Sequence, residues 1–249
     1  MAGVRRRILR ILVKVAGFFF IIGATIFAIA YFTTDIPDPK AYVNSQATII
    51  QYSNGDELGR IGAQNRTIIP LAQIPIQLRH SVLAAEDKNF YSQGAFNPLG
   101  MLRGAINTLL GKGLQGGSSI TQQYAKTAFL SSERTIQRKV IELVVAIKLE
   151  NQLSKDQIFE NYLNTIYFGR GAYGVETGAK VYFGKSADQL TTAESAVLAA
   201  ILRSPGYYDP DFREGNEERL LARYRYVLNN MVDRKSTRLN SSHEWISRM

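Results

Sequence analysis

Two acidic residues, Glu86 and Asp87, are the first whose setting could support acid–base chemistry. They follow an apolar segment and precede a loop that contains Gly94 and Pro98, so we expect them at the end of a helix. Apolar neighbours and the negative end of a helix dipole both favour the protonated form of a carboxyl group. A carboxyl group in such a place suits a general base that works near neutral pH. The alternative is a pair of solvated residues at an ordinary helix end, and this segment alone favours that alternative.

A second segment, QGGSSITQQYAK at 115–126, could bind an anionic or polyhydroxylated ligand. Ser118 or Ser119 can cap the helix that follows, and the free N–H groups at a helix start attract anions. Gln123 adds an amide donor, and Lys126 adds a cation on the same side of the helix. A capped helix explains the serines without a ligand, and amides and lysines also gather on solvated faces.

A third segment, RKVIELVVAIKLE at 138–150, is apolar nearly all round a helix, which predicts burial. Glu142 would then lie in the interior, where an unpaired carboxylate is costly. Arg138 at i−4 and Lys139 at i−3 are its expected partners. Either this is a structural ion pair that orients a core helix, or it is a second active-site carboxylate with two cations beside it.

The elements that must position these residues are mainly α-helical. Apolar and polar residues on both sides of Asn54-Gly55 predict a hairpin over 47–61, which is the one clear strand signal in the sequence. Ser154 with Gln157 and Thr191 with Glu194 have the spacing of capping boxes. Helices are expected over 76–88, 98–111, 118–130, 133–150, 155–166, 173–182, 191–203 and within 213–233.

The N-terminus predicts a membrane anchor. Residues 15–32 form an uncharged run of 18, close to the minimum for a spanning helix. Four arginines and Lys14 precede this run, so the positive-inside rule leaves the N-terminus in the cytoplasm and the rest outside, at a bacterial cell membrane. A cleaved signal peptide, ending near Ala28-Ile-Ala30, is the alternative. We therefore divide the chain into a tail, anchor and linker over 1–40, one domain over 41–233 and a foreign or disordered tail over 234–249.

Composition excludes several classes of function. The chain has 249 residues and a net charge of +9, of which +4 lies in 1–40 and +3 in 234–249, so the nearly balanced body does not suggest nucleic-acid binding. It has no cysteine and two histidines, which excludes thiolate chemistry and imidazole-rich metal clusters and leaves no predicted metal ligands. Two GxGxxG patterns, at 111–116 and 169–174, lack the flanking strands of a dinucleotide site and are expected in loops between helices.

In order along the chain, these segments resemble the peptidoglycan glycosyltransferase domain, family 51, of class A penicillin-binding proteins and monofunctional transglycosylases. Five motifs carry the resemblance: Glu86, Asp87, Phe90 and Gly94; GGSSITQQYAKT at 116–127; Arg138, Lys139 and Glu142; KDQIFENYLNTIYFGRGAYGVETGA at 155–179; and ESAVLAAILRSP at 194–205. Three positions depart from the family pattern. Gln93 occupies a position where the family usually has histidine, Ser119 replaces a threonine and Thr127 replaces an asparagine. Gln93 cannot act as an imidazolium.

The resemblance implies a lysozyme-like α fold with a small membrane-associated lobe. It implies that lipid II is polymerised into glycan strands with release of undecaprenyl pyrophosphate. Glu86 would be the general base and Glu142 the second carboxylate, on the donor side. The positions that match substrate contacts are Asp87, Phe90, Ser118, Ser119, Gln123, Lys126, Arg138 and Lys139. The helix over 98–112 could be part of the core or the lobe that rests in the bilayer.

Partners follow from the same resemblance. We expect lipid II, the growing glycan strand, the lipid bilayer and the cell-wall synthesis machinery, with Mg²⁺ or Mn²⁺ assisting the pyrophosphate and no organic cofactor. The S-x-x-K nucleophile of a transpeptidase is missing, so we expect no acylation by penicillin. Two other functions stay open: glycan cleavage by a lytic transglycosylase or lysozyme, and a non-catalytic membrane-anchored scaffold.

Overall fold

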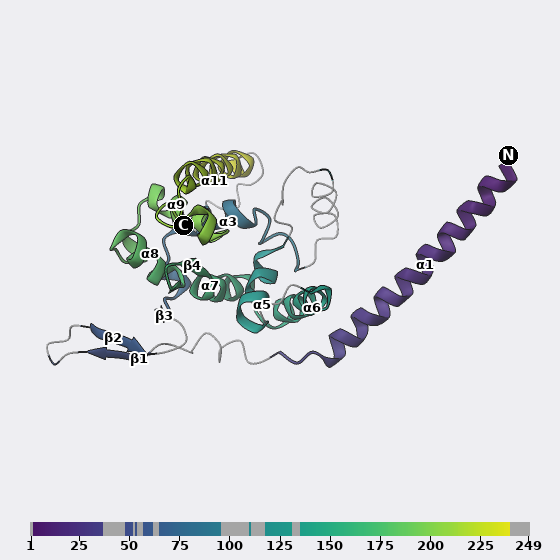
Figure 1. Cartoon of the computed structure of the whole chain (residues 1–249), viewed down its shortest axis with the longest axis horizontal. Helices are drawn as coiled ribbons and strands as arrows, with labels where there is room; N and C mark the ends of the chain where they lie inside the picture. Colours follow the sequence, from purple (N-terminus) through teal and green to yellow (C-terminus); the bar gives the residue numbers. More distant parts are fainter. Residues whose placement is uncertain are drawn as a thin grey trace.

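The structure is a computed structural model of the chain, and it describes residues 2–36, 48–51, 53, 57–61, 65–95, 110, 118–130 and 135–239. A helical body carries a long N-terminal helix that projects away from it, with a small hairpin on the opposite side in the view of Figure 1. The helix predicted over 98–111 lies outside the described residues apart from Leu110. The mainly helical class, the apolar N-terminal helix and the hairpin are confirmed.

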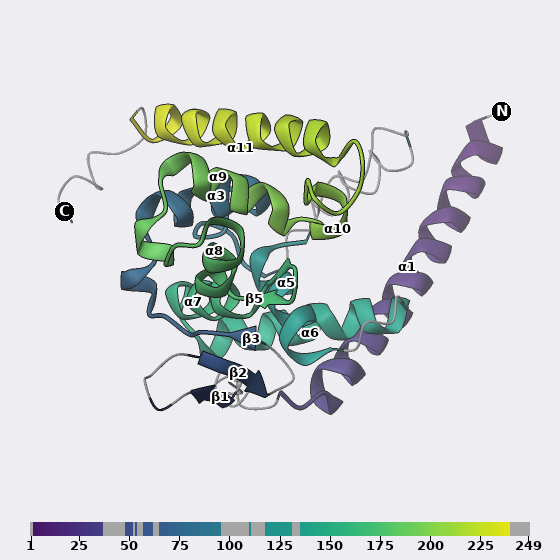
Figure 2. The same cartoon turned by 60° about the vertical axis from the view of Figure 1, so that its left-hand side comes forward.

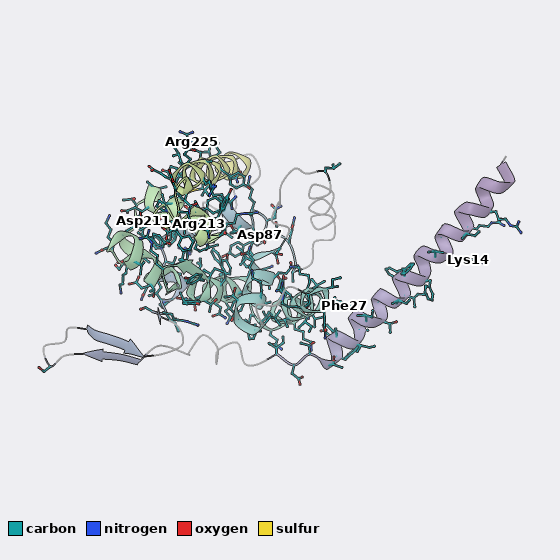
Figure 3. The ribbon with its side chains drawn as sticks, viewed as in Figure 1. Lys14, Phe27, Asp87, Asp211, Arg213 and Arg225 are labelled. Carbon is teal, nitrogen blue, oxygen red and sulfur yellow. The ribbon has the colours of Figure 1, made fainter. Side chains whose placement is uncertain are left out.

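Helix α1, Ala2–Thr33, contains the predicted anchor. Its Val13–Thr33 stretch is long and apolar enough to cross a membrane, with a mean hydropathy of 2.3. Figure 3 shows Lys14 far out along α1, and Phe27 closer to the body. The end of α1 meets helix α6, Ile136–Gln152, where Lys148 Nζ donates to the carbonyl oxygen of Thr34 at 2.7 Å. This bond satisfies a carbonyl just beyond the last helical turn of α1, which has no partner within that helix.

The helices of the body begin largely where the capping residues predict. Ser154 and Thr191 form complete capping boxes with Gln157 and Glu194, as expected. Gly184 ends α8 at a φ of 65°, a left-handed conformation that glycine adopts without steric cost. The helices are α3 Ile76–Glu86, α5 Ile120–Phe129, α6, α7 Lys155–Thr165, α8 Val175–Phe183, α9 Thr192–Leu202, α10 Pro205–Tyr208 and α11 Asn216–Leu239, with 3-10 turns η1 Leu71–Gln73 and η2 Ala187–Gln189. Helix α11 thus continues past Asp233, into the predicted tail.

Two small sheets complete the fold. Strands β1, Thr48–Gln51, and β2, Glu57–Ile61, pair antiparallel and confirm the hairpin. A second sheet, in the order β3-β5-β4, was not predicted; its strands are β3 Asn65–Arg66, β4 Tyr167–Gly169 and β5 Ala172–Tyr173. The expectation that 169–174 is a loop between helices is therefore wrong. These strands are too short to show a period of two, and β3 lies far from β5 in the sequence.

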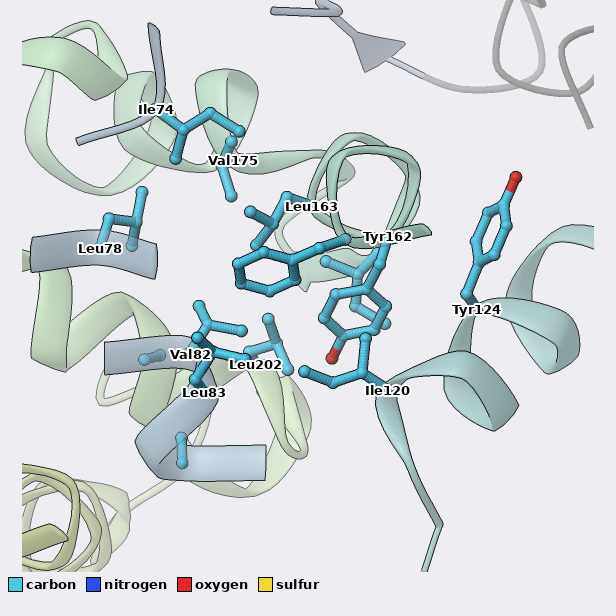
Figure 4. Close-up of a cluster of buried hydrophobic side chains, with 14 of the residues drawn as sticks. Ile74, Leu78, Val82, Leu83, Ile120, Tyr124, Tyr162, Leu163, Val175 and Leu202 are labelled. Carbon is cyan, nitrogen blue, oxygen red and sulfur yellow. The ribbon is translucent and has the colours of Figure 1, made fainter. Parts of the chain in front are cut away.

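The core lies between two groups of helices. Helix α3 packs against α9 and α11, while α5 packs against α6 and α7, as Figure 2 shows. Figure 4 shows the side chains that join the two groups, among them Leu78 and Leu83 of α3, Ile120 of α5 and Tyr162 of α7. Each fully buried side chain of this kind contributes about 1.5–3 kcal/mol. The core thereby brings the end of α3 next to the start of α5.

Candidate functional site

Glu86 is the last residue of α3, and its side chain is only 6% exposed. Gln123 Nε2 of α5 donates to its Oε2 at 3.0 Å. Arg223 Nη2 of α11 donates to its Oε1 at 3.1 Å, and the two side chains form an ion pair. The alternative of a solvated Glu86, which its own segment favoured, is therefore wrong. Residues of three helices, α3, α5 and α11, thus meet at this carboxylate.

Arg223 is the residue of this cluster that the sequence reading missed. Its Nη2 also donates to the backbone oxygen of Ala85 at 2.7 Å, and its guanidinium lies 4.6 Å from the centre of the Tyr226 ring. The side chain is 10% exposed. Nothing local distinguishes it from the other arginines of α11, because its partner lies 137 residues earlier in the chain. Only the packing of α11 on α3 identifies it.

Asp87 ties the end of α3 to the start of α5. Its Oδ2 accepts from the backbone N–H of Ile120 at 3.2 Å, and its Oδ1 accepts from that of Asn89 at 3.3 Å. Burial raises the pKa of Asp87, and the two N–H donors and Lys155 oppose that rise. The raised pKa predicted for a carboxyl group at this helix end is thus found at Asp87. Figure 3 shows the residue within the helical body.

The start of α5 has the predicted cap and two distinct glutamines. Ser119 Oγ accepts from the backbone N–H of Gln122 at 3.2 Å, which confirms one of the two serines considered as the cap. Ser118 Oγ instead accepts from Lys139 Nζ at 2.9 Å. The side chain of Gln122 is buried and donates to the backbone oxygen of Ala95 at 2.7 Å. Gln123 alone therefore turns toward Glu86.

Glu142 is buried in α6 with both predicted partners. It is 2% exposed, Arg138 Nη1 lies 3.1 Å from its Oε2, and Lys139 Nζ pairs with its Oε1. Two cations around one carboxylate leave a net charge of +1. Because Lys139 also binds Ser118, the first turn of α5 links this basic cluster to Glu86. The structural and the catalytic interpretations of Glu142 both agree with this geometry.

The two other predicted site residues lie in different settings. Phe90 is 1% exposed and packs in the core against Tyr91 and Phe159, so any influence on a substrate would act through the fold. Lys126 lies exposed in the last turn of α5.

Glu150 is a further polar centre that the sequence reading missed. Its Oε1 accepts from Thr121 Oγ1 and from Lys155 Nζ, each at 2.6 Å, and its Oε2 accepts from the backbone N–H of Ala95 at 2.7 Å. Lys155 Nζ also donates to the backbone oxygen of Gln93 at 2.8 Å. Glu150 of α6 and Lys155 of α7 thus fasten the segment that follows Asp87 onto their own helices, and Thr121 ties Glu150 to α5. Within the described part of the chain, no group of three acidic or histidine residues could hold a metal ion.

A profile of the Transglycosylase family matches residues 54–232, the segment that contains all of these groups. The chain belongs to this family. The predicted family and the enzyme class, a peptidoglycan glycosyltransferase, are confirmed. Each motif of the transglycosylase resemblance lies inside the matched segment.

Relatives of this transglycosylase chain are longer proteins. Penicillin-binding protein 1A of Mycobacterium tuberculosis is 43% identical over 84% of this chain and 26% of its own length. Its namesake from Aquifex aeolicus is 40% identical over 85% of this chain and 29% of its own length. The chain thus spans between a quarter and a third of these relatives. A crystal structure of penicillin-binding protein 1A from Haemophilus influenzae aligns with a TM-score of 0.41 at 23% identity, over 77% of this chain and 19% of that one.

Proposed function

We propose that this chain polymerises lipid II into glycan strands by inverting glycosyl transfer, with release of undecaprenyl pyrophosphate. The observation that carries the proposal is the setting of Glu86: a nearly buried carboxylate with Gln123 and Arg223 as donors, joined through the start of α5 to the basic cluster of α6. Transglycosylase membership supports glycan polymerisation in general. The lipid-linked substrate and its leaving group are our inference from this charge arrangement.

In the proposed reaction Glu86 accepts the proton of the acceptor's 4-hydroxyl group. That oxygen forms a bond to C1 of the donor sugar while the bond from C1 to the diphosphate oxygen breaks, which inverts the configuration at C1. A carboxylate has about four lone-pair sites, so the single donors on each oxygen of Glu86 leave room for the acceptor hydroxyl. Arg223 and Gln123 stabilise the negative charge that a base must have before it takes the proton.

The leaving diphosphate needs positive charge more than it needs a proton. Its departure develops negative charge on oxygen, which fixed cations stabilise best when they are held in place beforehand. Lys139 and Arg138 are held by Glu142, and Lys126 lies on the exposed side of α5. We assign these three cations to the diphosphate, and Ser118 and Ser119 to its oxygens or to the donor sugar. In this assignment Glu142 orients the cations and touches the donor only through them.

Cleavage of a glycan by a hydrolase or lytic enzyme is supported less well. Such enzymes need a protonated carboxylic acid beside the glycosidic oxygen. Both oxygens of Glu86 accept hydrogen bonds, one from Gln123 and one from Arg223, and a carboxyl group surrounded by donors suits a base. A neutral glycan also offers nothing to the basic cluster of α6.

The described residues do not fit an Mg²⁺ or Mn²⁺ site held by the protein. We therefore assign a metal ion no protein ligands and no step of the reaction. Membrane anchoring is supported by the apolar stretch of α1. We propose that the anchor is retained, because Lys148 of α6 contacts both Thr34 and the ring of Tyr31 at the end of α1. The basic residues that precede the apolar stretch support a cytoplasmic N-terminus with the body outside.

The test is polymerisation of lipid II by the full chain in detergent with Mg²⁺, followed by gel analysis of the glycan products. We expect polymer from the parent chain and a loss of about 10²–10⁴-fold in rate for Glu86→Gln, the usual contribution of a general base. Glu217→Gln, at an exposed position of α11, is the matched control and should keep the parent rate. Polymer from Glu86→Gln at the parent rate would refute the assignment of the base. Soluble fragments released from preformed glycan would instead support the hydrolase.

A further inference from the structure

The hydrogen bonds around Glu86 extend into the core through Tyr162, which lies in the 155–179 motif but was given no role in the site. Tyr162 lies on α7, is fully buried, and stands among the core side chains in Figure 4. Its hydroxyl donates to Gln123 Oε1 at 3.1 Å. Gln123 Nε2 then donates to Glu86 Oε2 at 3.0 Å. A continuous chain of two hydrogen bonds thus joins α7, α5 and α3.

We propose that Tyr162 is a positioning residue that fixes the orientation of the Gln123 amide, and thereby supplies Glu86 with its second donor. The inference rests on the proposed role of Glu86 as the base. Tyr162 itself touches neither substrate nor reacting atoms in this proposal.

The amide of glutamine has two ends that can exchange by a rotation. With Nε2 toward Glu86 the amide donates to the carboxylate, and with Oε1 toward Glu86 two acceptors face each other and repel. The carboxylate of Glu86 can only accept, so Nε2 must face it and Oε1 is left on the side of Tyr162. The phenol hydroxyl, which can donate or accept, is the donor that Oε1 then needs. Tyr162 can act as this donor while it is protonated, and burial, together with the negative charges of Glu86 and Asp87, raises its pKa well above the ordinary value. The hydroxyl therefore stays protonated throughout the range in which an enzyme of this kind works.

The charged groups that act on this hydrogen-bond chain come from two helices. Glu86 and Asp87 lie at the end of α3, and Arg223 of α11 pairs with the other oxygen of Glu86. Arg223 is held by the backbone oxygen of Ala85 and the ring of Tyr226, and neither of these contacts involves Gln123. Removal of the Tyr162 hydroxyl should thus leave the ion pair intact and affect only the donor from α5.

The test compares Tyr162→Phe with Tyr124→Phe. Tyr124 is also fully buried and lies on α5, but its hydroxyl points away from Tyr162 in Figure 4. Both variants remove one oxygen from a buried ring, so the midpoint temperatures of their thermal unfolding should fall by similar amounts. The rate of lipid II polymerisation is then measured against pH for the full chain in detergent.

For Tyr162→Phe we expect the acid limb of the kcat profile to move to higher pH, with KM unchanged. Loss of the Gln123 donor makes the carboxylate take up a proton more readily, so a larger fraction is inactive at a given acidic pH. At high pH the rate should fall by no more than about threefold, because Arg223 still holds the base. Tyr124→Phe should leave the limb where it is. An equal loss at every pH in Tyr162→Phe would mean a purely structural role and would overturn the inference.

A second readout does not depend on turnover. Glutamine is labelled with ¹⁵N, and the side-chain amide signal of Gln123 is the one that disappears in Gln123→Glu. This signal should change with pH in the parent chain, because Gln123 donates to Glu86. It should lose that response in Glu86→Gln. Tyr162→Phe should broaden or shift this signal and weaken the response, while Tyr124→Phe should not. An unchanged Gln123 signal in Tyr162→Phe overturns the inference, even if the chain proves inactive on lipid II. Conversely, a disturbed signal with no polymer from the parent would overturn only the proposed function.

Discussion

Arg223→Met tests whether Glu86 depends on a helix that no motif connects to it. The substitution removes the guanidinium and keeps an apolar side chain of similar length to pack against Tyr226. The two partners are 10% and 6% exposed, so solvent screens this ion pair little. Breaking a buried ion pair by removing one partner costs about 3–5 kcal/mol, because the other charge is left without compensation. Gln123 still donates to Glu86, so we expect the lower end, about 3 kcal/mol.

The same substitution in the Glu86→Gln background should cost much less. No charge is stranded there, and the remaining loss is the hydrogen bond to the backbone oxygen of Ala85, about 1 kcal/mol. The coupling between the two positions is therefore about 2 kcal/mol. For a domain of this size, that corresponds to about 4–8 °C in the midpoint of thermal unfolding.

The assay is a double-mutant cycle on the full chain in detergent, with unfolding followed by circular dichroism. The parent, both single variants and the double variant are measured at pH 7, together with their rates on lipid II. Arg223→Met should also lower kcat by about tenfold or more, because the base loses its cationic partner. Strictly additive effects of the two substitutions on unfolding would refute the argument, since they would mean that the two side chains do not interact in solution.

Three further predictions concern the fold and the anchor. Lys185 and Thr191 lower the pKa of Glu194 from its ordinary value of 4.5 to about 2, so its stabilising effect is present above pH 4.5 and lost as the pH falls toward 2. Glu194→Gln should therefore unfold at a lower temperature than the parent at pH 6 and at the same temperature at pH 2; a difference that persists at pH 2 would contradict the titration. Leu78→Ala removes a fully buried side chain and should cost about 2–5 kcal/mol in guanidinium unfolding, and a cost below 1 kcal/mol would show that the core is not packed as described. Lys148→Ala should loosen the junction of α1 with α6. Spin labels can be attached at Phe32→Cys and Asn151→Cys, because the chain has no natural cysteine, and the distribution of distances between them should become broader in Lys148→Ala. An unchanged distribution would show that the bond to Thr34 does not hold the junction.

Much of the helical framework could be predicted because its causes are local. The capping boxes at Ser154 and Thr191 depend on residues three positions apart, and both form as expected. The ion pairs of Glu142 arise within one turn of α6, so the spacing of Arg138 and Lys139 was enough to predict them. The small sheet of β3, β4 and β5 was not predicted, because β3 pairs with β5 across a long stretch of chain and all three strands are too short to carry a pattern.

The candidate site divides in the same way. Motif spacing alone was enough to propose Glu86, Gln123 and the basic residues of α6, together with the family to which the chain belongs. That Glu86 is buried, that Arg223 reaches it from 137 residues away, and that Tyr162 reaches Gln123 across 39 residues followed only from how the helices pack. Contacts within a turn of helix are set by its geometry, whereas contacts between helices depend on which apolar faces meet when the core forms. Short segments thus identify the candidate reacting groups, and distant neighbours decide the burial and the hydrogen bonds of those groups.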